Sequence, residues 1–215
     1  MKRKIYLIDG NNFIYRMFFW MPEFVTKDGR IVNAVFWMAK FFVNQLVKEN
    51  PDYIFFVKDA KGGTFRDEIY SEYKATRERM PDNLRSQIGG VVDMIAMMEI
   101  PMIEEPGYEA DDVIWTLAVD LWKDPDNEIL ILTGDKDLYS LVTENVKIYD
   151  TMKRRISWID ETREKFGIDP TMIIDYLSIV WDTADNIPGI AGFWPKKAVT
   201  TVSYTHLRAH ETRHD

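Results

Sequence analysis

The chain has 215 residues, 46% of them apolar and 13% aromatic, so it can bury a core and intrinsic disorder is not expected. Its net charge of −8 argues, on its face, against nucleic acid as a partner, although that argument weakens if many carboxylates gather to hold cations. The absence of cysteine excludes disulfides and thiolate metal sites.

The N-terminus leads directly into a strand-like segment, which leaves no room for a signal peptide. No apolar run approaches the ~20 residues that a membrane span needs. We therefore expect a cytoplasmic protein without membrane contact.

Short apolar runs, rich in β-branched and aromatic residues, each stop at an acidic or polar residue. Such runs are typical of buried strands. The predicted strands are Lys4–Ile8, Tyr53–Val57, Glu128–Leu132 and Val146–Tyr149.

Apolar residues at helical spacing separate these strands. The spacing predicts helices over Asn33–Lys48, Leu84–Met98 and Val113–Leu121. Asp169 and Pro170 form an N-cap and first-turn pair ahead of a further helix. Alternating strands and helices predict an α/β fold with a mainly parallel central sheet flanked by helices on both faces.

Three aspartates follow the predicted strands directly. Asp9, Asp59 and Asp135 each lie just past a strand's carboxyl end. Because parallel sheets bind ligands beyond those ends, the three carboxylates are expected to converge on one rim.

Further acidic residues form tight groups along the chain. Gathered at one place, these carboxylates would repel one another strongly without counter-cations. Oxygen ligands without histidine or cysteine suit Mg²⁺ or Mn²⁺, and two such ions about 4 Å apart are a common means of phosphodiester hydrolysis. The candidate ligands are Asp9, Asp59, Glu109, Asp111, Asp112, Asp135, Asp137, Asp182 and Asp185.

Each acidic group also has a simpler interpretation. Glu109–Asp112 opens a predicted helix, where acids complement the helix dipole, Asp135–Asp137 could be a solvated loop, and Asp185–Gly189 could be a turn. Their joint placement after strand ends favours a metal site. A haloacid-dehalogenase-type phosphatase would need a second aspartate where Asn11 stands, so that alternative fails.

A basic and aromatic segment follows the second strand. Its cations and rings are spaced to share one helix face, which suits single-stranded nucleic acid. A solvated amphipathic helix fits the composition equally well, since residues 58–79 hold six basic and five acidic residues. The residues on the expected face are Arg66, Tyr70, Tyr73, Lys74 and Arg77.

Several motifs occur in the order found in bacterial and phage 5′-nucleases. Over residues 4 to about 199 the chain resembles this 5′→3′ exonuclease (flap endonuclease) family, and it is similar to the 5′-nuclease domain of DNA polymerase I. The motifs are Ile8–Asn12, Asp59–Arg66, Tyr73–Arg77, Met80–Pro81, Gly107–Asp112, Thr133–Asp137 and Asp182–Gly189.

The resemblance implies a PIN-like fold with a helical arch and a truncated C-terminal helix-three-turn-helix region. It implies a divalent-metal-dependent nuclease that cuts DNA at 5′ ends or 5′ flaps during replication or repair. Asp9, Asp59, Glu109 and Asp111 would hold the ion nearest the scissile phosphate, and the other five carboxylates would build or support a second site. Tyr73, Lys74 and Arg77 would be the catalytic residues of the arch.

The same resemblance implies a duplex-gripping hairpin, commonly with a K⁺ ion. Gly189, Gly192, Lys196 and Lys197 fall at its DNA-contacting positions. Trp194 stands where the family has a second glycine, which argues against close backbone approach there. Trp181 also replaces a usual glycine.

The last residues differ in character from the rest. All three histidines lie within Thr201–Asp215, which lacks a clear apolar period and resembles a translated sequencing-adapter read. A histidine-rich metal tract is the alternative. We expect a monomer with a nuclease core over residues 1–165, a partial DNA-anchoring region over 166–200 and a non-native tail over 201–215.

Two other functions share parts of this pattern. A PIN-like ribonuclease also has acidic strand ends but fewer carboxylates. A non-catalytic DNA-binding module would not need the complete acidic set.

Overall fold

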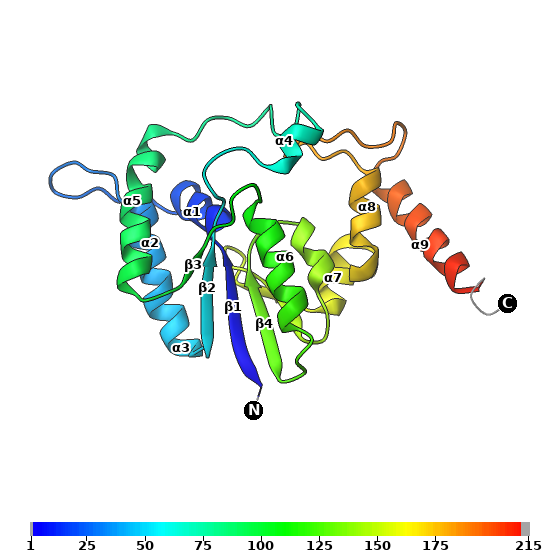
Figure 1. The fold of residues 1–215 in the computed structure, drawn as a ribbon, viewed down its shortest axis with the longest axis horizontal. Helices are drawn as coiled ribbons and strands as arrows, with labels where there is room; N and C mark the ends of the chain where they lie inside the picture. The colour runs from blue at the N-terminus through cyan, green and yellow to red at the C-terminus, as the bar shows by residue number, and fades with distance from the viewer. Residues whose placement is uncertain (1, 212–215) are drawn as a thin grey trace.

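The computed structural model describes residues 2–211, which form a six-stranded sheet between two layers of helices (Figure 1). The strand order is β3-β2-β1-β4-β5-β6. All neighbours are parallel except β5 and β6, which pair antiparallel. The strands are β1 (Arg3–Asp9), β2 (Tyr53–Val57), β3 (Met102–Ile103), β4 (Asn127–Leu132), β5 (Val146–Asp150) and β6 (Arg155–Ser157).

Helices cover both faces of this sheet. On one face α1, α2 and α5 pack around Ile8, Phe13 and Phe56, and on the other α6 and α8 pack around Leu7 and Ile131. The helices are α1 (Gly10–Phe19), α2 (Asn33–Phe41), α3 (Val47–Glu49), α4 (Phe65–Ile69), α5 (Asp82–Met97), α6 (Ala110–Leu121), α7 (Ile159–Phe166), α8 (Ile173–Ile179) and α9 (Pro195–Glu211). A π-helical turn, η1 (Phe42–Leu46), joins α2 to α3, and η2 (Asp137–Leu141) and η3 (Pro170–Met172) are 3₁₀ turns.

The first strand passes into the first helix without a loop. Asp9 caps α1 by accepting a hydrogen bond from the Asn12 amide. A Cβ atom at Gly10 would lie 2.5 Å from the Phe56 ring and 2.7 Å from the Val57 carbonyl oxygen. Glycine at this position therefore lets α1 begin directly above β2 and fixes Asp9 at the rim.

The structure confirms the predicted α/β class and the four strands, each within a residue or two. The helix expected over Asn33–Lys48 is present, with η1 inside it. The short strands β3 and β6 were not predicted, because two or three residues carry too little periodicity to be recognised. The helices α1 and α7 were not predicted either, and α7 carries apolar side chains only at its two ends, Ile159 and Phe166.

The single helix predicted across Arg66–Arg77 is wrong. Helix α4 ends at Ile69, Tyr70 is extended, and Lys74 has a φ of 53°, in the left-handed region. The Lys74 amide instead donates to the Asp185 carbonyl oxygen, and the Asn186 side chain donates to the Glu72 carbonyl oxygen. These contacts bend the segment back toward the turn after α8, and Figure 1 shows α4 above α6.

The last helix continues past Thr200, where an interruption was expected. Val202 is 1% exposed, and the His206 ring lies 2.7 Å from the Asp175 carboxylate on α8. The apolar side of α8 therefore has a partner in α9. The structure does not describe residues 212–215, so that part of the proposed tail lies outside it.

Within residues 2–211, no helix is both long and apolar enough to cross a bilayer.

Candidate functional site

A cleft of about 410 Å³ lies at the carboxyl ends of the central strands. Carboxylates from three strand ends and from the start of α6 line it, together with two cations from the segment after α4. The residues that line it are Asp9, Asn11, Asn12, Tyr15, Asp59, Lys74, Arg77, Glu78, Met80, Ala110, Asp111 and Asp135. The predicted convergence of Asp9, Asp59 and Asp135 is confirmed.

Hydrogen bonds hold the innermost carboxylates in place. Thr133 Oγ1 donates to Asp9 Oδ2 at 2.6 Å, and the Asn12 amide donates to Asp9 Oδ1 at 3.1 Å. Asp59 accepts from Asn11 Nδ2 at 2.5 Å and from the Ala110 amide at 2.8 Å. The two aspartates are thus positioned from β4, α1 and α6 before any ligand arrives.

Burial and crowding make two of these carboxylates resist ionisation. Burial is the largest cause raising the pKa of Asp9 to about 6, and nearby Asp135 and Asp59 raise it further. Burial and then the charges of Asp9 and Asp135 raise the pKa of Asp111 to about 8. At neutral pH the Asp111 carboxyl therefore keeps its proton, because Lys74 and Arg77 do not offset the crowded negative charge around it.

A second carboxylate group lies between the 3₁₀ turn η2 and the turn after α8. Asp137, Asp182 and Asp185 each offer an oxygen within 4.8 Å of the others. Asp137 Oδ1 is buried and has no hydrogen-bond partner in the described part of the chain, and burial raises the pKa of this carboxyl to about 7. Lys136 Nζ lies 3.2 Å from Asp182. An orphaned, buried oxygen beside two more carboxylates fits a divalent cation.

The segment after α4 brings cations and a tyrosine onto the same carboxylates. Lys74 Nζ lies 2.5 Å from Glu109 Oε1 and 3.9 Å from Asp185. Arg77 contacts Asp185 at 2.7 Å. The buried Tyr73 hydroxyl lies 2.8 Å from Glu109 and 3.0 Å from Asp185, and burial, followed by these carboxylates, raises its pKa.

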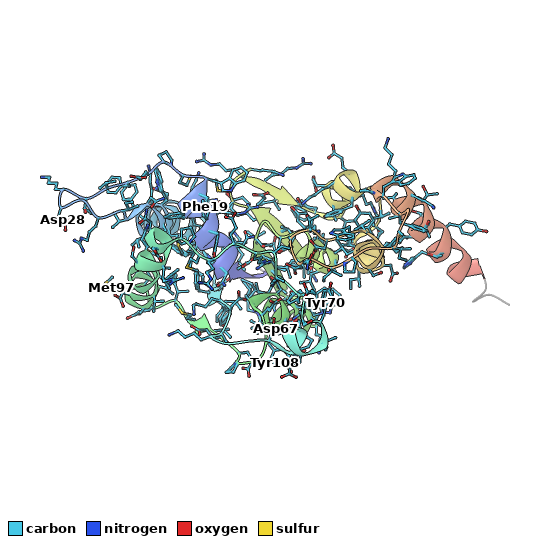
Figure 2. The ribbon with its side chains drawn as sticks, turned by 90° about the horizontal axis from the view of Figure 1, so that it is seen from above. Phe19, Asp28, Asp67, Tyr70, Met97 and Tyr108 are labelled. Atoms are coloured by element: carbon cyan, nitrogen blue, oxygen red, sulfur yellow. The ribbon has the colours of Figure 1, made fainter. Side chains whose placement is uncertain are left out.

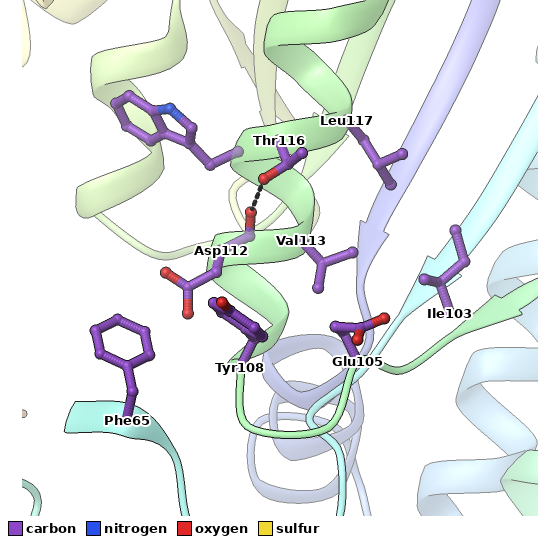
Figure 3. A pocket seen from close by; sticks show the side chains of 9 residues that line it. Phe65, Ile103, Glu105, Tyr108, Asp112, Val113, Thr116 and Leu117 are labelled. Atoms are coloured by element: carbon purple, nitrogen blue, oxygen red, sulfur yellow. Dashed lines mark hydrogen bonds between the residues drawn. The ribbon is translucent and has the colours of Figure 1, made fainter. Parts of the chain in front are cut away.

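Asp112 faces away from the cleft. Its carboxylate forms two hydrogen bonds with Arg66, at 2.6 and 2.7 Å, and accepts one from the Glu109 amide. Burial is the largest influence on its pKa and would raise it, but these bonds together lower it. Figure 3 shows Asp112 beside a separate pocket on the outer face of α6, where Thr116 bonds to its carbonyl oxygen.

Other expected DNA contacts lie outside the cleft. Tyr70 is exposed on the α4 side (Figure 2). The hairpin residues Gly189 and Gly192 and the lysines Lys196 and Lys197 follow α8, and Lys197 Nζ lies over the Phe193 ring. A Cβ atom at Gly189 would lie 2.4 Å from the Trp181 amide nitrogen, so this glycine permits close packing of the hairpin backbone.

Four polar residues of the site were not singled out from the sequence. Asn11, Asn12 and Thr133 position the aspartates, and Lys136 contacts Asp182. Each of them lies within three residues of a candidate ligand in the chain, which is the signal that could have identified them.

The comparisons with known proteins agree with this geometry. The family described as 5′-3′ exonuclease, N-terminal resolvase-like domain, matches residues 4–167. A 5′-3′ exonuclease from Aquifex aeolicus is 39% identical over 92% of this chain and 68% of its own length. DNA polymerase I from Pseudomonas aeruginosa is 40% identical over 90% of this chain, but the chain spans only 21% of that enzyme.

Solved structures share the fold. The T5 5′-exonuclease with bound zinc superposes with a TM-score of 0.76 at 20% identity, covering 94% of this chain and 75% of the other. A complex of the T5 flap endonuclease with DNA and metal ions superposes with a TM-score of 0.75, also at 20% identity and with the same coverage of both chains.

Proposed function

Because the chain belongs to the 5′-3′ exonuclease family, through its N-terminal resolvase-like domain, we propose that it hydrolyses DNA phosphodiester bonds at 5′ ends and 5′ flaps. The observation that carries the proposal is the meeting of two groups of carboxylates: Asp9, Asp59, Asp111 and Asp135 in one cleft at the edge of the sheet, and Asp137, Asp182 and Asp185 around the orphaned oxygen of Asp137. Replication and repair are the processes in which such ends arise.

Two Mg²⁺ or Mn²⁺ ions complete the proposed site. Asp9, Asp59, Glu109 and Asp111 would hold the ion nearest the scissile phosphate, and Asp135, Asp137, Asp182 and Asp185 the second. Asp112 would support the site from outside by holding Arg66 and the Glu109 amide. Such ions activate water and stabilise the charge that develops on the phosphate.

The side chains of residues 70–77, which we call the arch segment, position the substrate in this proposal. Lys74 and Arg77 reach the rim from above and would exchange a carboxylate partner for a DNA phosphate oxygen. Tyr73 restrains Glu109 and Asp185 through its hydroxyl group. Arg66 and Tyr70 would contact the strand beyond the cleft.

The hairpin after α8 would hold the duplex part of the substrate. Gly189, Gly192, Lys196 and Lys197 are the proposed contacts, with a K⁺ ion at the backbone carbonyls. Because one chain supplies every proposed ligand, we propose that a monomer acts, and that it acts in the cytoplasm, where its DNA substrate is found.

The test uses a 5′-flap duplex and a matched pair of variants. Asp135→Asn keeps the shape of the side chain and removes the charge, so cleavage should be lost in Mg²⁺ while DNA binding remains. Asp93→Asn is the control, because Asp93 is exposed on α5 and away from the cleft. Full activity of Asp135→Asn would refute the site, and preferential cleavage of RNA would instead indicate a PIN-like ribonuclease.

A further inference from the structure

A second cleft of about 410 Å³ lies at the carboxyl end of α1, between the helix α2–η1–α3 and the turn that joins β5 to β6. None of the proposed metal ligands lines it. Its volume falls within the range of about 300–1,000 Å³ that is usual for small-ligand pockets.

The charges of this cleft differ from those of the rest of the molecule. Among the residues that the structure describes, Lys40, Lys48 and Arg154 line it and no acidic residue does. Within residues 2–211 neither Lys48 nor Arg154 forms an ion pair. Two acids lie close to the cleft, Glu49 and Asp150: burial is the largest cause that raises the pKa of Tyr149, Arg154 opposes it, and the charges of these two carboxylates add to it. In a chain of net charge −8, this cleft presents free cations to an anion.

The cleft also presents a fixed aromatic surface. The Trp37 indole nitrogen donates to the Pro22 carbonyl oxygen at 2.8 Å, and the indole packs edge-on against Phe36 at 5.1 Å. Lys40 Nζ lies 4.6 Å above the same ring. Held in this way, Trp37 loses little conformational freedom when a planar ligand stacks on it.

A π-helical turn brings two side-chain amides to the cleft. Asn44 and Gln45 belong to the π-helical turn η1, and both line the cleft. Such turns are rare and occur frequently at functional sites. A side-chain amide offers a donor and an acceptor together, which matches the edge of a nucleobase. Arg154, on the opposite wall, has a φ of 50°.

We propose that this cleft binds a phosphorylated nucleoside, with the base on Trp37 and the phosphate between Lys48 and Arg154. The base edge would meet Asn44 and Gln45. The α6 pocket of Figure 3 is similar in volume, but Glu105 and Asp112 line it and none of the described cations does, so it would repel phosphate. The proposed site goes beyond the nuclease activity and does not involve its metal ligands.

The test compares three ligands by NMR on the whole chain: dTMP, thymidine and inorganic phosphate. We expect dTMP to bind with a Kd of about 1 mM or tighter and to shift the Trp37 indole and the Asn44 and Gln45 amide signals. Thymidine and phosphate should each bind at least about tenfold more weakly, because each lacks one half of the contact. The shifts should be the same in Mg²⁺ and in EDTA.

Charge-reversing variants distinguish binding in this cleft from nonspecific electrostatic attraction of the nucleotide to the protein surface. Lys48→Glu and Arg154→Glu should each weaken dTMP binding at least about tenfold. The matched control is Lys153→Glu, since Lys153 is adjacent in the chain, is exposed and does not line the cleft. Trp37→Ala would remove the stacking surface directly, but it could also prevent folding. Lys48 and Arg154 are exposed, so their variants keep the test valid in that case.

The outcomes are distinct from those of the nuclease test. If phosphate binds as tightly as dTMP, or if Lys153→Glu weakens binding as much as Lys48→Glu, the site is refuted while flap cleavage stays intact. Comparing dTMP with short oligothymidylate, using Asp135→Asn to prevent cutting, distinguishes a free nucleotide from a unit of single-stranded DNA. Loss of flap cleavage in the wild type would refute only the proposed nuclease function.

Discussion

Lys74 and Glu109 form an ion pair in which the ammonium nitrogen lies 2.5 Å from Oε1, and both side chains are largely buried. One partner is proposed to contact phosphate and the other to bind a cation. In the metal-free protein the Lys74 ammonium and the Glu109 carboxylate neutralise each other, and this ion pair keeps the arch segment in contact with the carboxylates. A divalent ion that takes over Glu109 would release Lys74 toward the substrate.

Removing the cation of this pair should destabilise the metal-free protein. Lys74→Met leaves the Glu109 carboxylate buried without its partner. Loss of one member of a buried ion pair lowers the free energy of unfolding by about 3–5 kcal/mol. The loss should be smaller here, because the Lys74 side chain is 19% exposed. Thermal melts in EDTA should show the loss. Saturating Mg²⁺ should restore most of the lost stability. An equal loss with and without Mg²⁺ would contradict the idea that a divalent ion replaces Lys74 as the partner of Glu109.

The arch cations should matter for cleavage. Lys74→Ala and Arg77→Ala are each expected to slow cutting of a 5′-flap duplex by at least ~10²-fold, as is usual when an electrostatic contact to the transition state is removed. Single-turnover rates measure this. Lys123→Ala is the control, because Lys123 is exposed after α6 and pairs with Asp120. Equal cutting of 3′ flaps would show that the segment does not select 5′ ends.

The stability of the metal-free protein should fall as pH rises from about 5 to 8. Folding raises the pKa values of Asp9, Asp137 and Asp111 from 3.8 to about 6, 7 and 8. Over this window the folded state holds more protons than the unfolded state, so raising the pH lowers the free energy of unfolding. The aspartates with lowered pKa values titrate below this range and do not alter the sign.

Melting temperatures in EDTA across this pH range provide the measurement. A fall of at least a few degrees is expected, since about 1 kcal/mol corresponds to ~2–4 °C for a domain of this size. Asp111→Asn should reduce the slope, because its amide does not titrate. A flat profile in EDTA would show that the cleft carboxylates are ionised throughout.

Truncation at Thr200 tests the last helix. The sequence suggests that residues 201–215 are a non-native tail whose loss has no effect, whereas the structure buries Val202 and pairs His206 with Asp175. On the structural evidence the truncated chain should melt at least ~4 °C lower, because a buried valine and its packing are lost. An unchanged melting temperature would support the tail hypothesis. Val202→Ala in the whole chain is the milder companion variant.

Four of the six strands, and the edge of the sheet where the aspartates meet, could be predicted from the sequence. Most residues of β1, β4 and β5 and the carboxyl end of β2 are buried, so apolar residues dominate these runs and the strands can be recognised without knowing their neighbours. Parallel order then places Asp9, Asp59 and Asp135 at one edge, because the carboxyl ends of parallel strands share that edge.

Tertiary structure alone decided how the segment from Arg66 to Arg77 folds. Its spacing fits a helix, yet Lys74 adopts a left-handed conformation because its amide bonds to Asp185, more than a hundred residues away in the chain. The same holds for Asp112, which turns to Arg66 and away from the cleft. Contacts of this kind depend on which distant carboxylate lies within reach, and local periodicity carries no information about that.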